Sequence, residues 1–110
     1  MTGHGWRKLM RLAESFVYRV TQLAPKLPIF DFIQQAAGLD DRSMYGTFNM
    51  GCGFAVYVPS DQATRAMELA KSAGIQAWLG GTIEKEDDRK AVVIEPLGIA
   101  FEGESLKIRA

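Results

Sequence analysis

Apolar and glycine residues alternate with a few polar ones in residues 47–58, around which the rest of the chain is expected to fold. Residues 54–58 form an almost unbroken apolar run of aromatic and valine side chains that stops at Pro59. Such a run predicts a strand with both faces covered. Before it, Gly51 and Gly53 predict a loop with unusual backbone angles or a close approach by another molecule. A ligand-binding loop and a bulge without a ligand both explain this pattern.

Apolar residues recur at helical spacing in three other stretches. Residues 6–17 carry the first stripe, and residues 16–20 are either its last turn or a short extended piece. The second stripe, residues 29–37, follows a proline and ends at a glycine, as helices commonly do. The third stripe, residues 63–73, is rich in alanine, which predicts close packing onto the sheet.

Shorter signals complete the expected architecture. Asp40 or Asp41 is expected to cap a short helical turn that leads into the central loop. Residues 84–89 are charged and predict the solvated tip of a hairpin. The remaining strands are predicted at 75–79 continuing at 82–83, at 91–94, and in a last hairpin of 99–101 and 106–108. This order predicts an α+β domain with helices against a mixed, largely antiparallel sheet.

Composition narrows the class of protein. The 110 residues predict a single domain, 1–110, with 47% apolar and 24% charged residues. Thirteen basic residues balance thirteen acidic ones, which argues against a general nucleic-acid binder. One cysteine excludes an internal disulfide, and no apolar stretch reaches membrane-spanning length. We therefore expect a cytoplasmic domain without nucleic-acid or membrane partners.

The first residues suit phosphate binding. A glycine-containing loop that opens a helix offers free backbone N–H groups and the positive end of the helix dipole. A frayed terminus before a helix with a solvated basic face is the alternative. His4 is a candidate proton carrier near neutral pH, or a bystander. The candidate phosphate-binding residues are Thr2, Gly3, Gly5 and Arg7, with Lys8 or Arg11 as further cations.

The central loop supplies the second set of candidates. Asn49 is expected to hydrogen-bond the amide or ribose of a substrate, and Thr47 a phosphate or the loop itself. Gly51 would let a ligand approach the backbone. Cys52 is expected to pack rather than to act as a nucleophile, because the sequence places no base beside it. No acidic cluster has the pattern of a metal site, so no metal ligand is predicted.

Two stretches resemble motifs of phosphoribosylformylglycinamidine cyclo-ligase, also called aminoimidazole ribonucleotide synthetase. They are residues 2–11, TGHGWRKLMR, and residues 47–54, TFNMGCGF. Residues 28–34 and 73–80 resemble the same family in the same order, and the likeness fades after Ile83. The resemblance implies the carboxy-terminal domain of such an enzyme, with a layered α/β/α form partly like a ferredoxin fold.

The resemblance also implies a reaction. That family closes the imidazole ring of purines with ATP. The amide oxygen is activated by phosphorylation, and a ring nitrogen then displaces the phosphate. Its amino-terminal domain carries most ligands of ATP and Mg²⁺ and most of the dimer contact. The expected partners are therefore a phosphorylated ribonucleotide substrate, an amino-terminal ATP-binding domain and a second copy of the chain.

Two departures from the family pattern bear on activity. The family's histidine two positions before the threonine that matches Thr2 is not in this chain, and His4 interrupts the usual triple glycine. We expect no cyclo-ligase activity and no tight binding of ATP or Mg²⁺ by this chain alone. Two alternatives remain: a related phosphotransferase acting on selenide, thiamine phosphate or carbamoyl groups, and a non-catalytic module that binds a nucleotide or a partner.

Overall fold

A four-stranded mixed sheet forms the centre of the molecule. The computed structural model describes residues 4–25 and 27–104. The strands are β1 (Val17–Val20), β2 (Gly81–Glu84), β3 (Ala91–Ile94) and β4 (Ile99–Glu102), in the order β2-β1-β3-β4. β1 runs parallel to β3, whereas the β1–β2 and β3–β4 pairs are antiparallel. The α+β class and the mixed, largely antiparallel sheet are thus confirmed.

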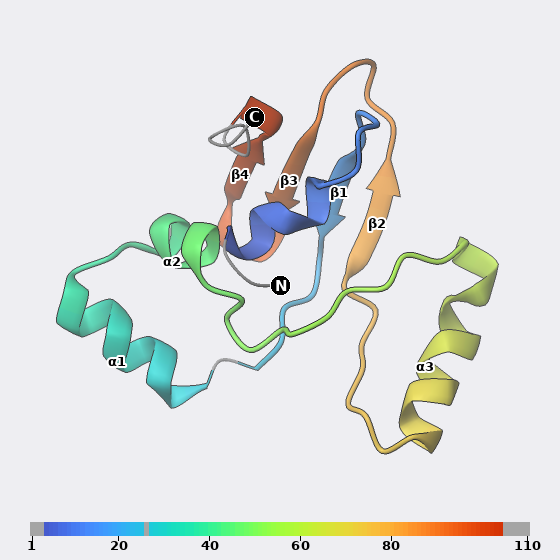
Figure 1. The fold of residues 1–110 in the computed structure, drawn as a ribbon, viewed down its shortest axis with the longest axis horizontal. Coiled ribbons are helices and arrows are strands. Elements are labelled where there is room, and N and C mark those ends of the chain that lie inside the picture. Colours follow the sequence, from blue (N-terminus) through green and yellow to red (C-terminus); the bar gives the residue numbers. More distant parts are fainter. Residues whose placement is uncertain (1–3, 26, 105–110) are drawn as a thin grey trace.

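The described helical elements are the 3₁₀ turns η1 (Gly5–Met10), η2 (Ser60–Gln62) and η3 (Glu95–Leu97), and the helices α1 (Pro28–Ala37), α2 (Asp41–Thr47) and α3 (Ala63–Ser72). The turn η1 lies in front of the sheet, α1 and α2 lie to one side of it, and α3 stands apart on the other side (Figure 1). α1 begins at Pro28 and ends at Gly38, whose φ of 66° is left-handed. The Asp40 carboxylate accepts a hydrogen bond from the Ser43 amide at 2.8 Å and caps α2. The predicted second helix and the Asp40 cap are confirmed.

The core lies between η1, the end of α2 with its following loop, and one face of the sheet. η1 crosses in front of β1 and β3 (Figure 1). The buried side chains of this core are Trp6, Leu9, Met10, Tyr18, Val20, Met44, Tyr45, Met50, Cys52, Val92, Ile94 and Phe101. The core therefore joins the first residues of the chain to the central loop.

The predicted first helix is too long. Only residues 5–10 are helical, in the 3₁₀ form, and residues 12–14 bend away. The extended alternative for residues 16–20 is the one adopted, because β1 lies between β2 and β3 in the middle of the sheet. Val17, Tyr18 and Val20 are buried there, so tertiary pairing prevails over helical spacing.

The strand predicted at residues 54–58 is absent, and so is the one at 75–79; the second strand begins only at Gly81. Phe54 is 85% exposed and Val56 69% exposed. In the described parts of the chain no strand pairs with either segment, so neither gains a ladder of hydrogen bonds. The predicted burial was therefore wrong.

The packing predicted for the third helix is also wrong. No residue of α3 is buried, and the helix stands away from the sheet (Figure 1). We call residues 53–80, which comprise both extended segments and α3, the arm. Side-chain hydrogen bonds connect it to the body, among them those from Tyr57 Oη to the Leu9 carbonyl at 2.7 Å and from Trp78 Nε1 to the Gln22 carbonyl at 3.1 Å.

The charged segment at residues 84–89 is not a hairpin tip, because β1 separates β2 from β3. Ion pairs connect the segment to β1, with Arg19 contacting Glu84 at 3.2 Å and Glu86 at 2.8 Å. The last hairpin is instead formed by β3 and β4, which turn through η3. The second strand predicted for this hairpin, residues 106–108, lies outside the described residues.

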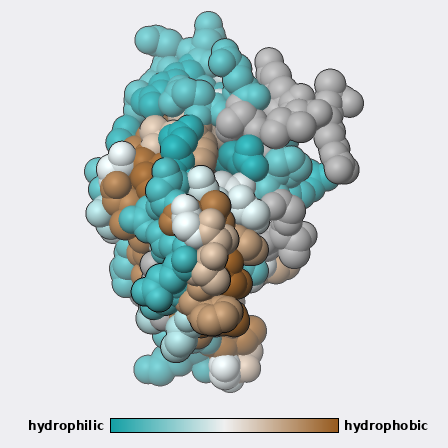
Figure 2. Space-filling view, turned by 90° about the vertical axis from the view of Figure 1, so that its left-hand side faces the viewer, coloured by the Kyte–Doolittle hydropathy of each residue, from teal (hydrophilic) through white to brown (hydrophobic). Residues whose placement is uncertain are grey.

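The surface is not uniformly polar. Figure 2 shows apolar surface beside polar surface on the side that α1 occupies in Figure 1. Ile29 and Phe32 of α1 are 54% and 68% exposed. Among the described residues, no helix has the length and apolar character needed to cross a bilayer.

Candidate functional site

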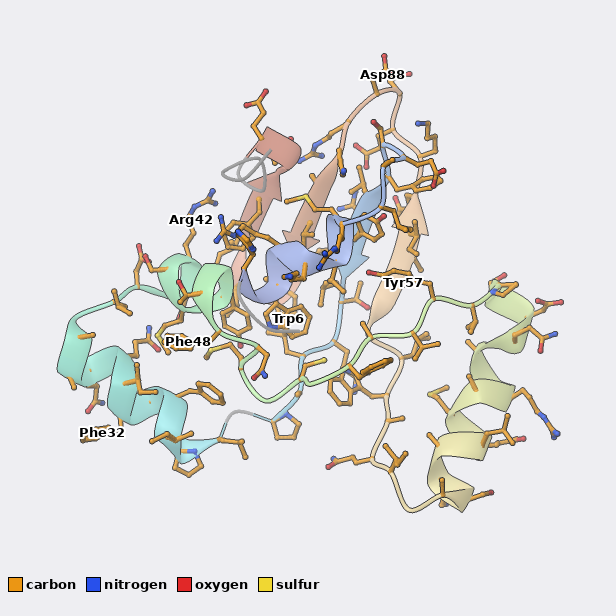
Figure 3. All side chains as sticks on the ribbon, viewed as in Figure 1. Trp6, Phe32, Arg42, Phe48, Tyr57 and Asp88 are labelled. Atoms are coloured by element: carbon orange, nitrogen blue, oxygen red, sulfur yellow. The ribbon has the colours of Figure 1, made fainter. Side chains whose placement is uncertain are left out.

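The first residues and the central loop meet at one edge of the core. The Trp6 indole nitrogen donates to the Asn49 carbonyl at 3.0 Å, across 43 positions of sequence (Figure 3). Gly5 is buried with φ +56°, and a Cβ there would lie 2.9 Å from both the Gly46 carbonyl carbon and the Phe48 oxygen. Only glycine fits so close to another backbone. The structure therefore places Gly5 against the end of α2 and Trp6 in contact with Asn49, while the binding roles of Gly5 and Asn49 stay predictions.

Arg7 holds this junction from the side. Its Nε and Nη2 donate to the Gly46 carbonyl at 3.1 and 2.7 Å, and Nε also contacts the His4 carbonyl at 3.3 Å. A charged donor shared between backbone oxygens is a strong positioning contact. In this conformation the Arg7 cation orients the end of α2, and any contact with a substrate phosphate stays a prediction.

Asn49 shapes its own loop. Its Oδ1 accepts the Gly51 amide at 2.8 Å, and Met50 and Gly51 have φ of 54° and 95°. This Asx-type turn requires a positive φ at Gly51, which explains why a glycine stands there. The side-chain NH₂ of Asn49, which is half-buried, supplies the donors that a ligand would use.

The positions of the remaining candidate residues neither support nor oppose their predicted roles. Thr47 is exposed at the end of α2, and His4 is half-buried before η1. Thr2 and Gly3 lie outside the described residues. Because η1 is a six-residue 3₁₀ turn, it offers little of the helix dipole expected from a longer helix.

A hollow of about 410 Å³ opens beside this junction, between η1 and the start of the arm. Its lining residues are Lys8, Leu9, Arg11, Gly53, Phe54, Ala55 and Tyr57. Neither Gly5 nor Asn49 lines it. Sequence reasoning named Lys8 and Arg11 as cations but missed the hollow, because its second wall comes from residues expected to be a buried strand.

Tyr57 joins the two walls of the hollow. Figure 3 shows its side chain pointing from the arm back toward η1, where the hydroxyl donates to the Leu9 carbonyl. Burial raises the pKa of Tyr57 to about 12, so the phenol stays protonated and remains a donor near neutral pH. Its ring lies 5.7 Å from that of Tyr18. The Tyr18 hydroxyl, by contrast, is buried without a hydrogen-bond partner in the described part of the chain.

We expect removal of the two hydroxyls to have opposite effects on the free energy of unfolding. Tyr57→Phe loses a hydrogen bond and should lower it by about 1 kcal/mol, whereas Tyr18→Phe removes an unpaired buried group and should raise it by about 1 kcal/mol. Urea titrations followed by circular dichroism measure both. A loss in Tyr18→Phe as large as in Tyr57→Phe would contradict this assignment.

Cys52 behaves as a packing residue. It is buried in the core, and burial raises the pKa of its thiol, which disfavours the nucleophilic thiolate. Among residues 4–25 and 27–104, no group of three His, Cys, Asp or Glu side chains is placed to hold a metal ion.

Comparison with known proteins defines the class first. Residues 7–94 match the family described as "AIR synthase related protein, C-terminal domain", and the chain belongs to that family. Among its curated relatives, a phosphoribosylformylglycinamidine cyclo-ligase of Methanococcus maripaludis (strain C7) is 39% identical over 101 residues, covering 86% of this chain and 29% of the relative.

Two further relatives carry the same name. The cyclo-ligase of Methanocaldococcus jannaschii is 37% identical over 83 residues, or 76% of this chain and 24% of the relative. That of Caldicellulosiruptor saccharolyticus is 46% identical over 59 residues, or 54% of this chain and 17% of the relative. The chain thus spans less than a third of the length of these relatives.

Proposed function

We propose that the chain is the substrate-closing part of an ATP-dependent phosphoribosylformylglycinamidine cyclo-ligase in purine biosynthesis. The observation that carries this proposal is the junction of Gly5 and Trp6 with Asn49, held by the 3.0 Å indole hydrogen bond. It brings the amide side chain of Asn49 and the cation of Arg7 to one edge of the core. These groups suit the phosphate, ribose and amide of a ribonucleotide.

We further propose that ATP and Mg²⁺ bind chiefly outside this chain. Phosphoryl transfer needs a metal to neutralise phosphate charge, and Mg²⁺ is bound through carboxylates. Among the described residues, no group of three His, Cys, Asp or Glu side chains comes together, which supports metal binding outside this chain. The roles assigned to this chain are therefore binding and orientation: Asn49 toward the substrate amide or ribose, and the Gly5 loop and Arg7 toward its phosphate, with His4 as the candidate proton carrier.

The arm supports a proposed partner. Its apolar side chains, such as Phe54 and Val56, are exposed to a degree that is typical of uncovered interfaces. We propose that the amino-terminal ATP-binding domain of the complete cyclo-ligase covers it. A second copy of the chain, or another partner of a non-catalytic module, is the competing occupant.

A domain exchange tests the function. In the Methanococcus maripaludis relative, the matched segment is replaced by this chain, and turnover of formylglycinamidine ribonucleotide with ATP is measured. The hybrid is expected to turn over and the isolated chain is not, while Asn49→Ala in the hybrid should lower kcat/KM by about tenfold or more.

Gln35→Ala, on the exposed side of α1, serves as the matched control and should leave kcat/KM unchanged. A folded hybrid without turnover would refute the proposed function. Turnover by the isolated chain would refute the assignment of ATP and Mg²⁺ to the missing part.

A further inference from the structure

The sheet ends in two outer strands, β4 and β2, whose edges differ. At β4, the Arg42 guanidinium donates to the Ala100 carbonyl, and its Cζ lies 4.6 Å from the centre of the Phe101 ring. A cation placed on an outer strand is one of the devices that keep further strands from adding to a sheet. The β4 edge is therefore guarded at its centre.

The β2 edge carries free backbone groups. The Gly80 carbonyl accepts the amides of Thr21 and Gln22 at 2.8 and 3.2 Å, which fixes the alternation of hydrogen bonds along the β1–β2 pair. Because this alternation directs every second residue away from β1, the N–H and C=O groups of Gly81 and Ile83 point to the outer edge. In the described parts of the chain, no hydrogen bond from another element reaches them. β2 is therefore a template for a further strand.

The side chains of β2 also leave this edge open. Ile83 is 44% exposed, and its cross-strand neighbour Tyr18 is buried, so Ile83 lies at the rim of the core-side face. Thr82 and Glu84 alternate with it on the opposite face, where the Thr82 hydroxyl donates to the Glu84 carboxylate at 2.9 Å. Lys85, which follows the strand, bonds instead to the Ser15 carbonyl at 2.8 Å. The cation nearest in sequence thus does not guard the edge.

The arm is anchored away from this edge. The Tyr57 hydroxyl bonds to the Leu9 carbonyl, and its ring lies 5.7 Å from that of Tyr18, which belongs to the core. Both contacts hold residues 54–58 over the core-side face of the sheet. The extended apolar run of the chain therefore leaves the outer edge of β2 accessible.

We propose that the β2 edge is an interface at which a second copy of the chain adds antiparallel across a two-fold axis, joining the two sheets into one. The proposal rests on the sheet topology and is independent of the proposed function. Because each β2 has only four residues, the interface is small and the association weak.

The sequence of β2 is complementary to itself, which favours a second copy as the occupant. With the axis at Ile83, the outward N–H and C=O groups of this residue bond to those of Ile83 of the partner subunit, and the two side chains form an apolar pair. Thr82 then faces Glu84 of the partner subunit, the same hydroxyl–carboxylate combination that exists within one chain. An axis at Glu84 would instead oppose two carboxylates.

Sedimentation equilibrium of the full chain over a wide range of protein concentration tests the interface. We expect a monomer–dimer equilibrium that Ile83→Lys weakens by about tenfold or more, because it places two like charges at the axis. Leu69→Lys on α3 is the matched control, since Leu69 is 56% exposed and lies far from β2 in the fold (Figure 1). This variant should dimerise as the wild type does.

Amide hydrogen exchange supplies a second readout at single residues. The amides of Gly81 and Ile83 should become protected as the protein concentration rises, whereas those of Thr82 and Glu84, which face β1, should be protected at every concentration. A chain that stays monomeric would overturn the proposal, as would a dimer that Leu69→Lys weakens and Ile83→Lys does not. Protection of the Ile83 amide in the monomer would show that the arm, and not a second copy, covers the edge.

Discussion

Replacing Gly5 with alanine is expected to lower the free energy of unfolding by at least about 3 kcal/mol. The left-handed φ of +56° penalises any side chain, and the new Cβ would sit 2.9 Å from Gly46 and Phe48 backbone atoms and closer still to the Tyr45 carbonyl. Backbone atoms at the end of α2 cannot move aside without opening the core. Urea unfolding followed by circular dichroism measures the loss.

Gly38→Ala separates the two causes. Gly38 has a similar φ of +66°, but a Cβ there would meet nothing within 4 Å. Gly38→Ala should therefore lower the free energy of unfolding only by the cost of the left-handed backbone angle, about 1 kcal/mol. Equal losses at both glycines would show that the close approach of Gly5 to the central loop does not contribute to stability.

Local signals predicted α1 and the start of α2 well, because their limits depend on nearby residues. Pro28 fixes the first turn, Gly38 takes the left-handed angle and Asp40 caps the next helix. These effects operate within a few positions of sequence. They do not need the rest of the fold.

Local signals could not predict that the arm is exposed. The run at residues 54–58 is extended, as its composition indicates, but a strand also needs a neighbour. In the described structure β1 takes the place beside β2, and residues 54–58 pair with no strand. An apolar run specifies that something must cover it, but not which surface does so.

The candidate site residues came from the glycine-containing motifs, and their binding roles stay predictions. The structure adds that Trp6, next to Gly5, donates to the Asn49 carbonyl. Two features had no signal in the motifs. The guanidinium of Arg7 bonds to a backbone carbonyl, and η1 is a short 3₁₀ turn where a longer helix was expected.

Trp6→Ala is expected to have a larger effect still on the junction, lowering the free energy of unfolding by about 3–5 kcal/mol. Trp6 is only 4% exposed, and its ring lies 5.9 Å from that of Tyr45. Truncation leaves a cavity in the core and removes the donor to the Asn49 carbonyl. Thermal and urea unfolding measure the change.

Trp78→Ala provides the control of equal size, since Trp78 belongs to the arm and hydrogen-bonds the Gln22 carbonyl from a partly exposed position. It should lower the free energy of unfolding by about 1–2 kcal/mol. The difference between the two variants reports whether η1 or the arm anchors the central loop. If Trp78→Ala proved as damaging as Trp6→Ala, the arm would be part of the core, and the hollow beside Lys8 would be a closed interior rather than an accessible site.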